Sequence, residues 1–164
     1  MIDSELYEIA SKTLQMFREM GATIATAESC TGGMITGVLT EVPGSSDVVD
    51  RGFVTYTNAA KSEMLGVDPD LIKAHGAVSA QVARAMAQGA MRNCSAEVCV
   101  AVTGVAGPGL SERKPAGLVY IAGTAGTEIE VEEHRFIGDR AAVRRATVVA
   151  ALDLAIRLVS RAPV

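Results

Sequence analysis

The sequence predicts an α/β fold, a single-domain αβα sandwich with helices on both faces of a mixed, mostly parallel sheet of five or six strands. Short apolar strand-like segments alternate with segments of helical periodicity along most of the chain, which is typical of βα units. Near the end, two strand-like segments flank a turn at Gly126 and predict an antiparallel hairpin. A chain of 164 residues can bury roughly 70% of its unfolded surface. One domain over residues 1–164 is therefore expected.

Helices are expected where apolar residues recur every three or four positions beside capping residues. The first runs from Leu6 to beyond Phe17 and ends at Gly21. The others are expected at 34–42, 58–65, 69–75, 80–93 and 140–160. Asn58 is the expected N-cap of the helix 58–65, which makes Lys61 its third residue.

Strands are expected at 22–27, 48–57, 97–102, 117–125 and 128–137. The segment 97–102 is almost wholly apolar, so Cys99 is expected in the core rather than at a reactive site. In the last strand, acidic residues and His134 alternate onto one face. That face is expected to meet solvent, which makes His134 a surface residue.

Composition narrows the class of protein. The net charge is −4, there is no basic run and only 4% of residues are aromatic, so no nucleic-acid surface is expected. The longest apolar run is too short for a membrane span, and the acidic start is unlike a signal peptide. Three cysteines without zinc-ligand spacing indicate a reducing compartment, which we expect to be the cytoplasm, and no metal site.

Ser29 lies between the expected strand 22–27 and the expected helix 34–42. A hydroxyl there is held rigidly beside the unpaired N–H groups of a helix start, which can stabilise negative charge on an attacked carbonyl. The position is therefore typical of a nucleophile, although Ser29 or Thr31 could instead only cap the helix. Cys30 could also be a nucleophile at this place. No histidine can be placed beside it, so we expect a small buried residue.

A base for Ser29 has few candidates. Of the two histidines, His134 is expected to be exposed and His75 lies in a turn, so a lysine is the better candidate. Lys61 lies near a helix start, where the positive end of the helix dipole favours the neutral amine that a base must be. Tyr56 lies just before it, at the end of a strand. The alternative for Lys61 is a solvated surface lysine.

Two further segments could bind an anion. The glycine-rich loop 103–109 follows a buried strand, where α/β proteins place ligands, but it matches neither the P-loop nor the dinucleotide fingerprint. A plain turn stays open for this loop. Arg140 and Arg144 open the last helix, where the dipole disfavours cations, so each needs a partner. That partner is either a phosphate or a carboxylate such as Asp139.

The candidate residues lie in segments whose order along the chain is distinctive. The segments are Ala27–Gly33, Pro43–Ser46 with Arg51–Tyr56, Asn58–Lys61 with Leu65–Val67, Gly76–Ser79, Thr103–Pro108, Lys114–Pro115 and Gly138–Arg140. Together they resemble the C-terminal domain of the competence/damage-inducible protein CinA, a family that includes stand-alone nicotinamide mononucleotide deamidases. The resemblance extends from about residue 5 to residue 160. One departure is Leu110-Ser111, which replaces a more glycine-rich stretch and affects the expected flexibility of that loop.

The resemblance implies an amidohydrolase that converts nicotinamide mononucleotide to nicotinate mononucleotide and ammonia, without metal or cofactor, as a homodimer. It implies Ser29 as nucleophile, Lys61 as base and Tyr56 as an assisting group. The implied substrate-binding residues are Thr31, Gly32, Gly33, Ser46, Thr103, Gly104, Ala106, Arg140 and Arg144. Larger members carry an additional N-terminal domain, and this chain is expected to start after it. Two alternatives are a non-catalytic regulatory module linked to competence or DNA damage, and an amidase for a different small amide.

Overall fold

The computed structural model describes residues 2–161 and contains one five-stranded sheet. The strands are β1 (Ile24–Glu28), β2 (Val49–Val54), β3 (Val98–Gly104), β4 (Leu118–Ala125) and β5 (Glu128–Arg135). Their order in the sheet is β2-β1-β3-β4-β5. The first three run parallel, and β4 and β5 are antiparallel to their neighbours. The mixed α/β fold expected from the sequence, with its late hairpin, is confirmed.

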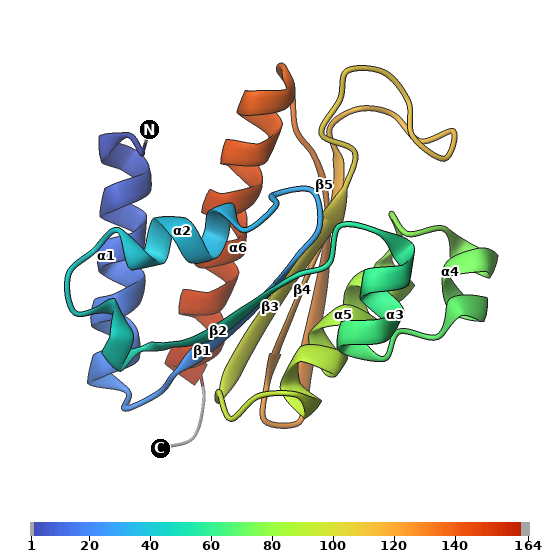
Figure 1. The fold of residues 1–164 in the computed structure, drawn as a ribbon. Coiled ribbons are helices and arrows are strands. Elements are labelled where there is room, and N and C mark those ends of the chain that lie inside the picture. The colour runs from blue at the N-terminus through green and yellow to red at the C-terminus, as the bar shows by residue number, and fades with distance from the viewer. Residues whose placement is uncertain (1, 162–164) are drawn as a thin grey trace.

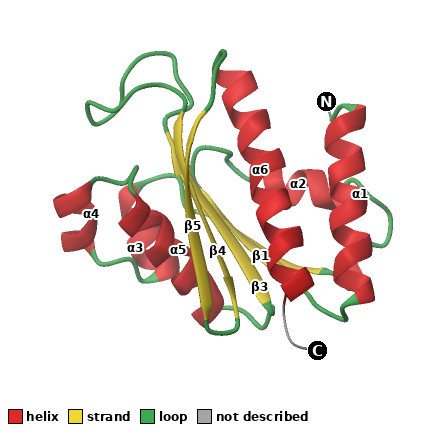
Figure 2. Ribbon diagram, turned by 180° about the vertical axis from the view of Figure 1, so that it is seen from behind, coloured by secondary structure: helices red, strands yellow, loops and turns green. Residues whose placement is uncertain are grey.

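Six helices cover the two faces of this sheet (Figure 1). One face carries α1 (Ser4–Glu19), α2 (Met34–Thr40) and α6 (Arg140–Arg161). The other carries α3 (Asn58–Leu65), α4 (Pro69–His75) and α5 (Ala80–Arg92), as the opposite view in Figure 2 also shows. A short 3₁₀ helix, Ser45–Asp47, occupies the expected turn after α2. None of the helices within residues 2–161 has the length and apolar run needed to cross a bilayer.

Alternation along the strands divides the core into two parts. On β3, Val100 and its alternate neighbours pack with α1, α2 and α6, whereas Cys99 and Ala101 pack on the side of α5. The second part is rich in alanine, which lets α5 lie close to the sheet. Cys99 is fully buried, as the sequence predicted.

The start of α3 corrects a sequence expectation. The N-cap is Thr57, whose backbone is extended and whose Oγ1 accepts the N–H of Ala60 at 3.0 Å. Asn58 is therefore the first helical residue, and Lys61 is the fourth rather than the third. Both residue types cap well, and the strand preceding the helix decides which of them keeps the extended backbone.

Two other expectations also change. The strand expected to stop at residue 102 continues to Gly104, because antiparallel pairing with β4 extends to Val119. The acidic face of β5 does not simply face solvent: Glu130 and Glu132 pair with arginines of α6, and His134 is half-buried and stacks on Phe136. Sequence alternation reports which side chains share a face, whereas the long side chains of α6 decide how that face is covered.

Candidate active site

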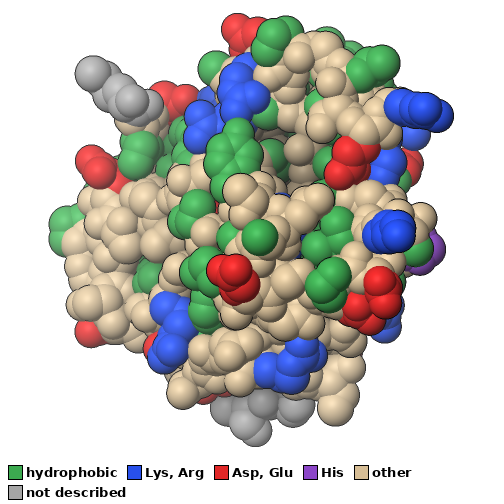
Figure 3. Space-filling view, turned by 45° about the vertical axis from the view of Figure 1, so that its right-hand side comes forward, with side chains coloured by type: hydrophobic (Ala, Val, Ile, Leu, Met, Phe, Trp, Pro, Cys, Tyr) green, Lys and Arg blue, Asp and Glu red, His purple; other side chains and the backbone are tan. Residues whose placement is uncertain are grey.

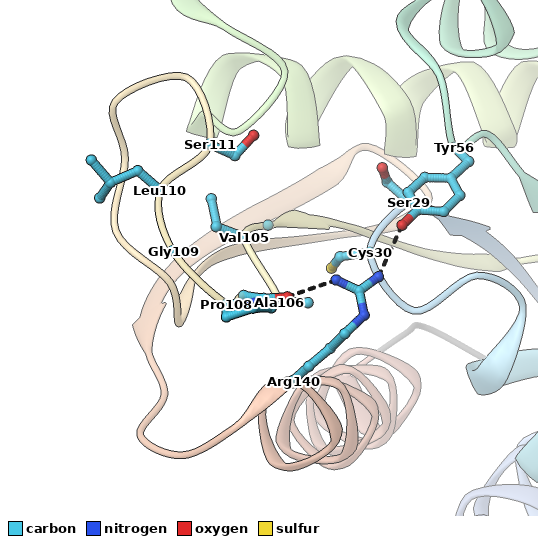
Figure 4. Close-up of a pocket in the computed structure, with 12 residues that line it drawn as sticks. Ser29, Cys30, Tyr56, Val105, Ala106, Pro108, Gly109, Leu110, Ser111 and Arg140 are labelled. Carbon is cyan, nitrogen blue, oxygen red and sulfur yellow. Dashed lines mark hydrogen bonds between the residues drawn. The ribbon is translucent and has the colours of Figure 1, made fainter.

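The candidate site lies at the carboxyl ends of the parallel strands, where open α/β sheets usually bind ligands. A pocket of about 220 Å³ opens there, lined by Ser29, Cys30, Tyr56, Arg140 and the loop residues Gly104–Ser111. Figure 4 shows these side chains arriving from four separate segments of the chain. Of the predicted residues, Ser29, Tyr56, Gly104, Ala106 and Arg140 line this pocket.

Ser29 begins a tight turn between β1 and α2. Its N–H donates to Val102 O of β3 at 3.1 Å, so a hydrogen bond to the neighbouring strand holds the start of the turn. Gly32 and Gly33 have φ values of +58° and +97°, which L side chains rarely adopt. These two glycines let the chain reverse within four residues and leave Ser29 only 7% exposed, facing the pocket.

The turn also leaves backbone donors free. The N–H of Gly32 donates to Ser29 O at 3.0 Å and is therefore occupied. Within residues 2–161, the N–H groups of Cys30, Thr31 and Gly33 donate to no protein acceptor. Three N–H groups of this turn therefore remain as candidates to stabilise an anion. One of them, that of Cys30, directly follows Ser29 in the chain.

Lys61 reaches Ser29 from α3, on the opposite face of the sheet from α2. Its Nζ lies 3.0 Å from Ser29 Oγ, and it donates to Thr55 O at 3.0 Å and to Tyr56 O at 3.4 Å. The side chain is 1% exposed, which excludes the solvated-lysine alternative. No carboxylate within the described residues forms an ion pair with it. Burial lowers the pKa of Lys61 below its usual value, because the charged form loses hydration.

Tyr56 and Arg140 form one wall of the pocket. Arg140 donates from Nη2 to Tyr56 Oη at 3.0 Å and from Nη1 to Gly107 O at 2.8 Å (Figure 4). The hydroxyl of Tyr56 is thus directed toward Arg140, while its backbone carbonyl is directed toward Lys61. Tyr56 remains 59% exposed, so its ring presents a free surface at the pocket.

Cys30 also lines the pocket, but its chemistry is unfavourable for a nucleophile. Burial raises the pKa of its thiol to about 12, and the carboxylate of Glu28 acts in the same direction. A thiol with such a pKa is protonated near neutrality. The small buried role expected for Cys30 agrees with this geometry.

Other predicted binding residues stabilise the pocket walls rather than line the pocket. Arg144 donates to the carbonyls of Cys30 and Thr31, at 3.2 and 2.9 Å, and so holds the Ser29 turn. Thr103 is buried and donates to Ala77 O at 2.8 Å. Thr31 is also buried, and its Oγ1 donates to Glu28 Oε1 at 2.7 Å.

Ser46 is placed apart from all of these residues. It is exposed in the 3₁₀ helix that precedes β2, at the end of the sheet where Val49 pairs with Ile24. Ser29 follows the other end of β1. Within this chain the structure does not bring Ser46 to the pocket.

Sequence reasoning missed two carboxylates. Glu28 is fully buried at the end of β1, and the charge within an otherwise small, apolar strand was the available signal. Glu112 lies in the loop between β3 and β4, next to the pocket residues Gly104–Ser111, and we call this whole connection the pocket loop. Its carboxylate accepts the N–H groups of Ala77 and Val78, at 3.0 and 3.2 Å. Nothing in the local sequence indicated this docking, because its partners are about 35 residues away.

Comparison with known proteins places this geometry in a family. The sequence profile of the CinA C-terminal domain matches residues 6–159. A crystal structure of a competence/damage-inducible protein, CihA, from Agrobacterium tumefaciens superposes with a TM-score of 0.92 at 47% identity, covering 96% of this chain and 98% of that one. The fold, including the mixed five-stranded sheet, is therefore that of the CinA superfamily structures.

Two relatives differ in length. Nicotinamide-nucleotide amidohydrolase PncC of Escherichia coli K12 is 46% identical over 155 residues, which are 93% of this chain and 94% of that protein. A competence-damage inducible protein of Caldicellulosiruptor bescii is 47% identical over 154 residues, but these are only 37% of its length. With its profile match running from α1 to α6 and its superposition on CihA, the chain belongs to the CinA C-terminal domain family.

Proposed function

We propose that this protein is a nicotinamide mononucleotide amidase with a serine nucleophile and a lysine base. The observation that carries the proposal is the contact of 3.0 Å between Lys61 Nζ and Ser29 Oγ inside a closed environment. The name of the E. coli relative, a nicotinamide-nucleotide amidohydrolase, supports the reaction class and the substrate.

The surroundings of Lys61 suit a neutral amine. A neutral amine has two N–H donors and one lone pair. The carbonyls of Thr55 and Tyr56 accept the two N–H groups, which leaves the lone pair for the hydroxyl proton of Ser29. The lowered pKa of Lys61 increases the fraction of the enzyme in this state. Lys61 can therefore deprotonate Ser29 as it attacks.

The proposed reaction is an acyl transfer in two steps. Ser29 Oγ forms a bond to the carboxamide carbon, its proton passes to Lys61, and the N–H groups of the Ser29 turn hold the oxyanion. The proton then passes from Lys61 to the leaving nitrogen, and ammonia departs from an ester on Ser29. Water, deprotonated by Lys61, attacks the ester carbonyl. The bond between the carbonyl carbon and Ser29 Oγ then breaks, Lys61 returns the proton to Ser29 Oγ, and nicotinate mononucleotide is released. The positive pyridinium ring withdraws electrons from the carboxamide and assists both attacks.

Arg140 is the proposed ligand of the 5′-phosphate. Its guanidinium contacts two neutral oxygens, Tyr56 Oη and Gly107 O, and no carboxylate within residues 2–161 pairs with it. A phosphate is a stronger acceptor for a guanidinium than either of these groups. The loop Gly104–Ser111 supplies the rest of the pocket wall for the ribose.

The test is ammonia release from nicotinamide mononucleotide by purified protein, with and without EDTA. We expect release that EDTA leaves unchanged and that Ser29→Ala abolishes. Ser160→Ala is the control, since Ser160 is exposed near the end of α6 and does not line the pocket. Free nicotinamide and the dinucleotide, assayed in parallel, distinguish amidases of other specificity. No release from any amide by the wild type would overturn the proposal and favour a binding role.

The cellular location is also a proposal. The three cysteines are odd in number and lack zinc-ligand spacing, which supports a reducing compartment and a cytoplasmic protein.

A further inference from the structure

The carboxylate of Glu28 is a buried charge to which the reaction above assigns no role. Glu28 is the last residue of β1 and directly precedes Ser29, and it is 0% exposed. Burying a carboxylate is costly unless hydrogen bonds replace its hydration. Here four donors serve it, from the Ser29 turn and the first turn of α2, and Thr26 of β1 bonds one of them, the hydroxyl of Thr36, at 2.6 Å.

The two oxygens of Glu28 bind different parts of the chain. Oε1 accepts Thr31 Oγ1 at 2.7 Å, within the Ser29 turn, and Ile35 N at 2.8 Å. Oε2 accepts Thr36 N and Thr36 Oγ1, both at 3.1 Å, and Thr26 Oγ1 lies 2.6 Å from Thr36 Oγ1 and 3.4 Å from Oε2. The carboxylate therefore ties the turn to the helix that follows it and to the strand that precedes it.

These contacts replace an ordinary helix cap. The N-cap position of α2 is Gly33, which has no side chain to accept the first N–H groups of the helix. Glu28 accepts two of those N–H groups across the turn. A simple cap would explain these two contacts. It would not explain the bond of 2.7 Å to Thr31, which lies inside the turn and contributes nothing to the helix.

We propose that Glu28 is a positioning residue that fixes the conformation of the turn Ser29–Gly33 for acyl transfer, an inference that rests on the proposed function. Glu28 fixes the turn through the side chain of Thr31, and Arg144 fixes it through the carbonyls of Cys30 and Thr31. These contacts from Glu28 and Arg144 restrain the turn, so that Ser29 Oγ stays beside Lys61 Nζ and the free N–H groups of the turn keep their positions. Small displacements of reacting groups cost large factors in rate.

The test begins with Glu28→Gln, which keeps the shape and replaces one acceptor oxygen by an N–H₂ donor. That donor must face one of the N–H or O–H groups that Glu28 accepts, so the turn shifts. We expect kcat to fall by about tenfold to a hundredfold while KM changes by less than about threefold. The pH at which kcat/KM is half-maximal should stay the same, because Lys61 keeps its surroundings.

A matched pair separates positioning from stability. Thr31→Val and Thr36→Val each remove one hydroxyl donor to Glu28, the first inside the turn and the second inside α2. We expect both variants to lower Tm, but only Thr31→Val to lower kcat by about tenfold. If Glu28 had only a structural role, kcat would fall in both variants in proportion to their loss of Tm. That result would contradict the positioning role.

A second readout does not depend on the substrate. A fluorophosphonate reacts with an activated serine by forming a P–O bond, with release of fluoride and transfer of the hydroxyl proton to the base. We expect Ser29 of the wild type to be labelled, and Glu28→Gln and Thr31→Val to be labelled about tenfold more slowly well below their Tm. Equal labelling rates in all variants would overturn the inference about Glu28 alone. A wild type that is not labelled would overturn the Ser29–Lys61 proposal and this inference with it.

Discussion

At the scale of single residues, the central feature of the candidate site is a desolvated lysine. Lys61 is nearly fully buried, and carbonyl oxygens and a hydroxyl surround its amine. Partial negative charges of carbonyls stabilise an ammonium less than a carboxylate would, so burial dominates and lowers the pKa. In the proposed mechanism this lysine is the base for Ser29.

The lowered pKa of Lys61 predicts how activity depends on pH. A base is active when neutral, so kcat/KM should rise tenfold per pH unit below that pKa and level off above it. The midpoint should lie below about 10.4, the ordinary lysine value. A pH–rate profile of the wild type measures this midpoint. A midpoint at or above the ordinary value would contradict the assignment of Lys61 as base.

The same shift affects stability. Between the folded and unfolded pKa of Lys61, the unfolded chain binds more protons, so the free energy of unfolding rises with pH in that window. Below the folded pKa both states are protonated and the full cost of burying the charge remains.

Arg140 and Arg144, both of α6, are predicted to act on different kinetic constants. Arg140→Ala should raise KM for nicotinamide mononucleotide at least tenfold with a smaller effect on kcat, since it removes a ligand of the substrate. Arg144→Lys should lower kcat about tenfold with little change in KM, because an ammonium lacks the fixed spacing of the Nε and Nη2 donors that the guanidinium directs at the two carbonyls. Steady-state kinetics of the two variants decide between these roles. A KM effect of Arg144→Lys resembling that of Arg140→Ala would place Arg144 in the substrate site.

At the scale of elements, α3 determines where Lys61 lies. The helix is short, and it is held by the Thr57 cap, by Gly66 at its C-terminus and by packing on α5. The packing is close at Gly89 of α5, where an added Cβ would lie 2.0 Å from Leu65 O. A glycine at that point lets α3 approach near enough for Lys61 to reach across to Ser29.

Gly89→Ala is therefore predicted to separate α3 from α5. We expect destabilisation by about 1–3 kcal/mol from the clash with backbone, together with a loss of kcat as Lys61 moves. Gly37→Ala is the matched control, since nothing lies within 4 Å of its added Cβ in the exposed part of α2. That variant should gain about 0.5–1 kcal/mol from helix propensity. Chemical denaturation and kinetics of both variants test the contact, and unchanged activity in Gly89→Ala would show that the clash is relieved elsewhere.

The pocket loop is a second element whose placement matters. Its tip forms a two-residue turn at Glu112 and Arg113, both with positive φ. Glu112 accepts N–H groups at Ala77 and Val78, and Lys114 donates to His75 O and Val78 O. These contacts attach the pocket loop to the segment His75–Val78. In return, Glu112 and Arg113, which are not glycine, adopt an unfavourable left-handed backbone conformation.

At the scale of the whole molecule, the topology gathers the site. Parallel pairing of β2, β1 and β3 brings their carboxyl ends together, and the antiparallel β4 and β5 return the chain so that α6 begins beside the same pocket. On the face in Figure 3, basic and acidic side chains are interspersed rather than gathered in one patch.

The same scale bears on assembly. Val54 remains exposed on β2, which is an edge strand of the sheet. An exposed apolar side chain on an open strand edge is suited to contact with a second copy. We expect a homodimer, which sedimentation velocity at micromolar concentration would detect. A single species at 17.0 kDa would contradict this expectation.

The sequence by itself determined the order of the elements and the place of Ser29 between a strand and a helix. Helical and strand periodicity and the signals of Gly21 and Gly126 act over a few residues, so they can be read without the fold. Local signals failed where two neighbours compete, as with Thr57 and Asn58 at the start of α3.

Only the tertiary structure decided which side chains meet. The contact of Lys61 with Ser29 joins residues 32 positions apart, and the hold of Arg144 on the turn joins residues 113 and 114 positions apart. Sequence patterns did not reveal these partners: Arg144 is expected to bind substrate, and the structure adds its two hydrogen bonds to the Ser29 turn. The physical reason is that periodicity records which face of an element is buried, whereas strand order and helix packing decide what that face is buried against.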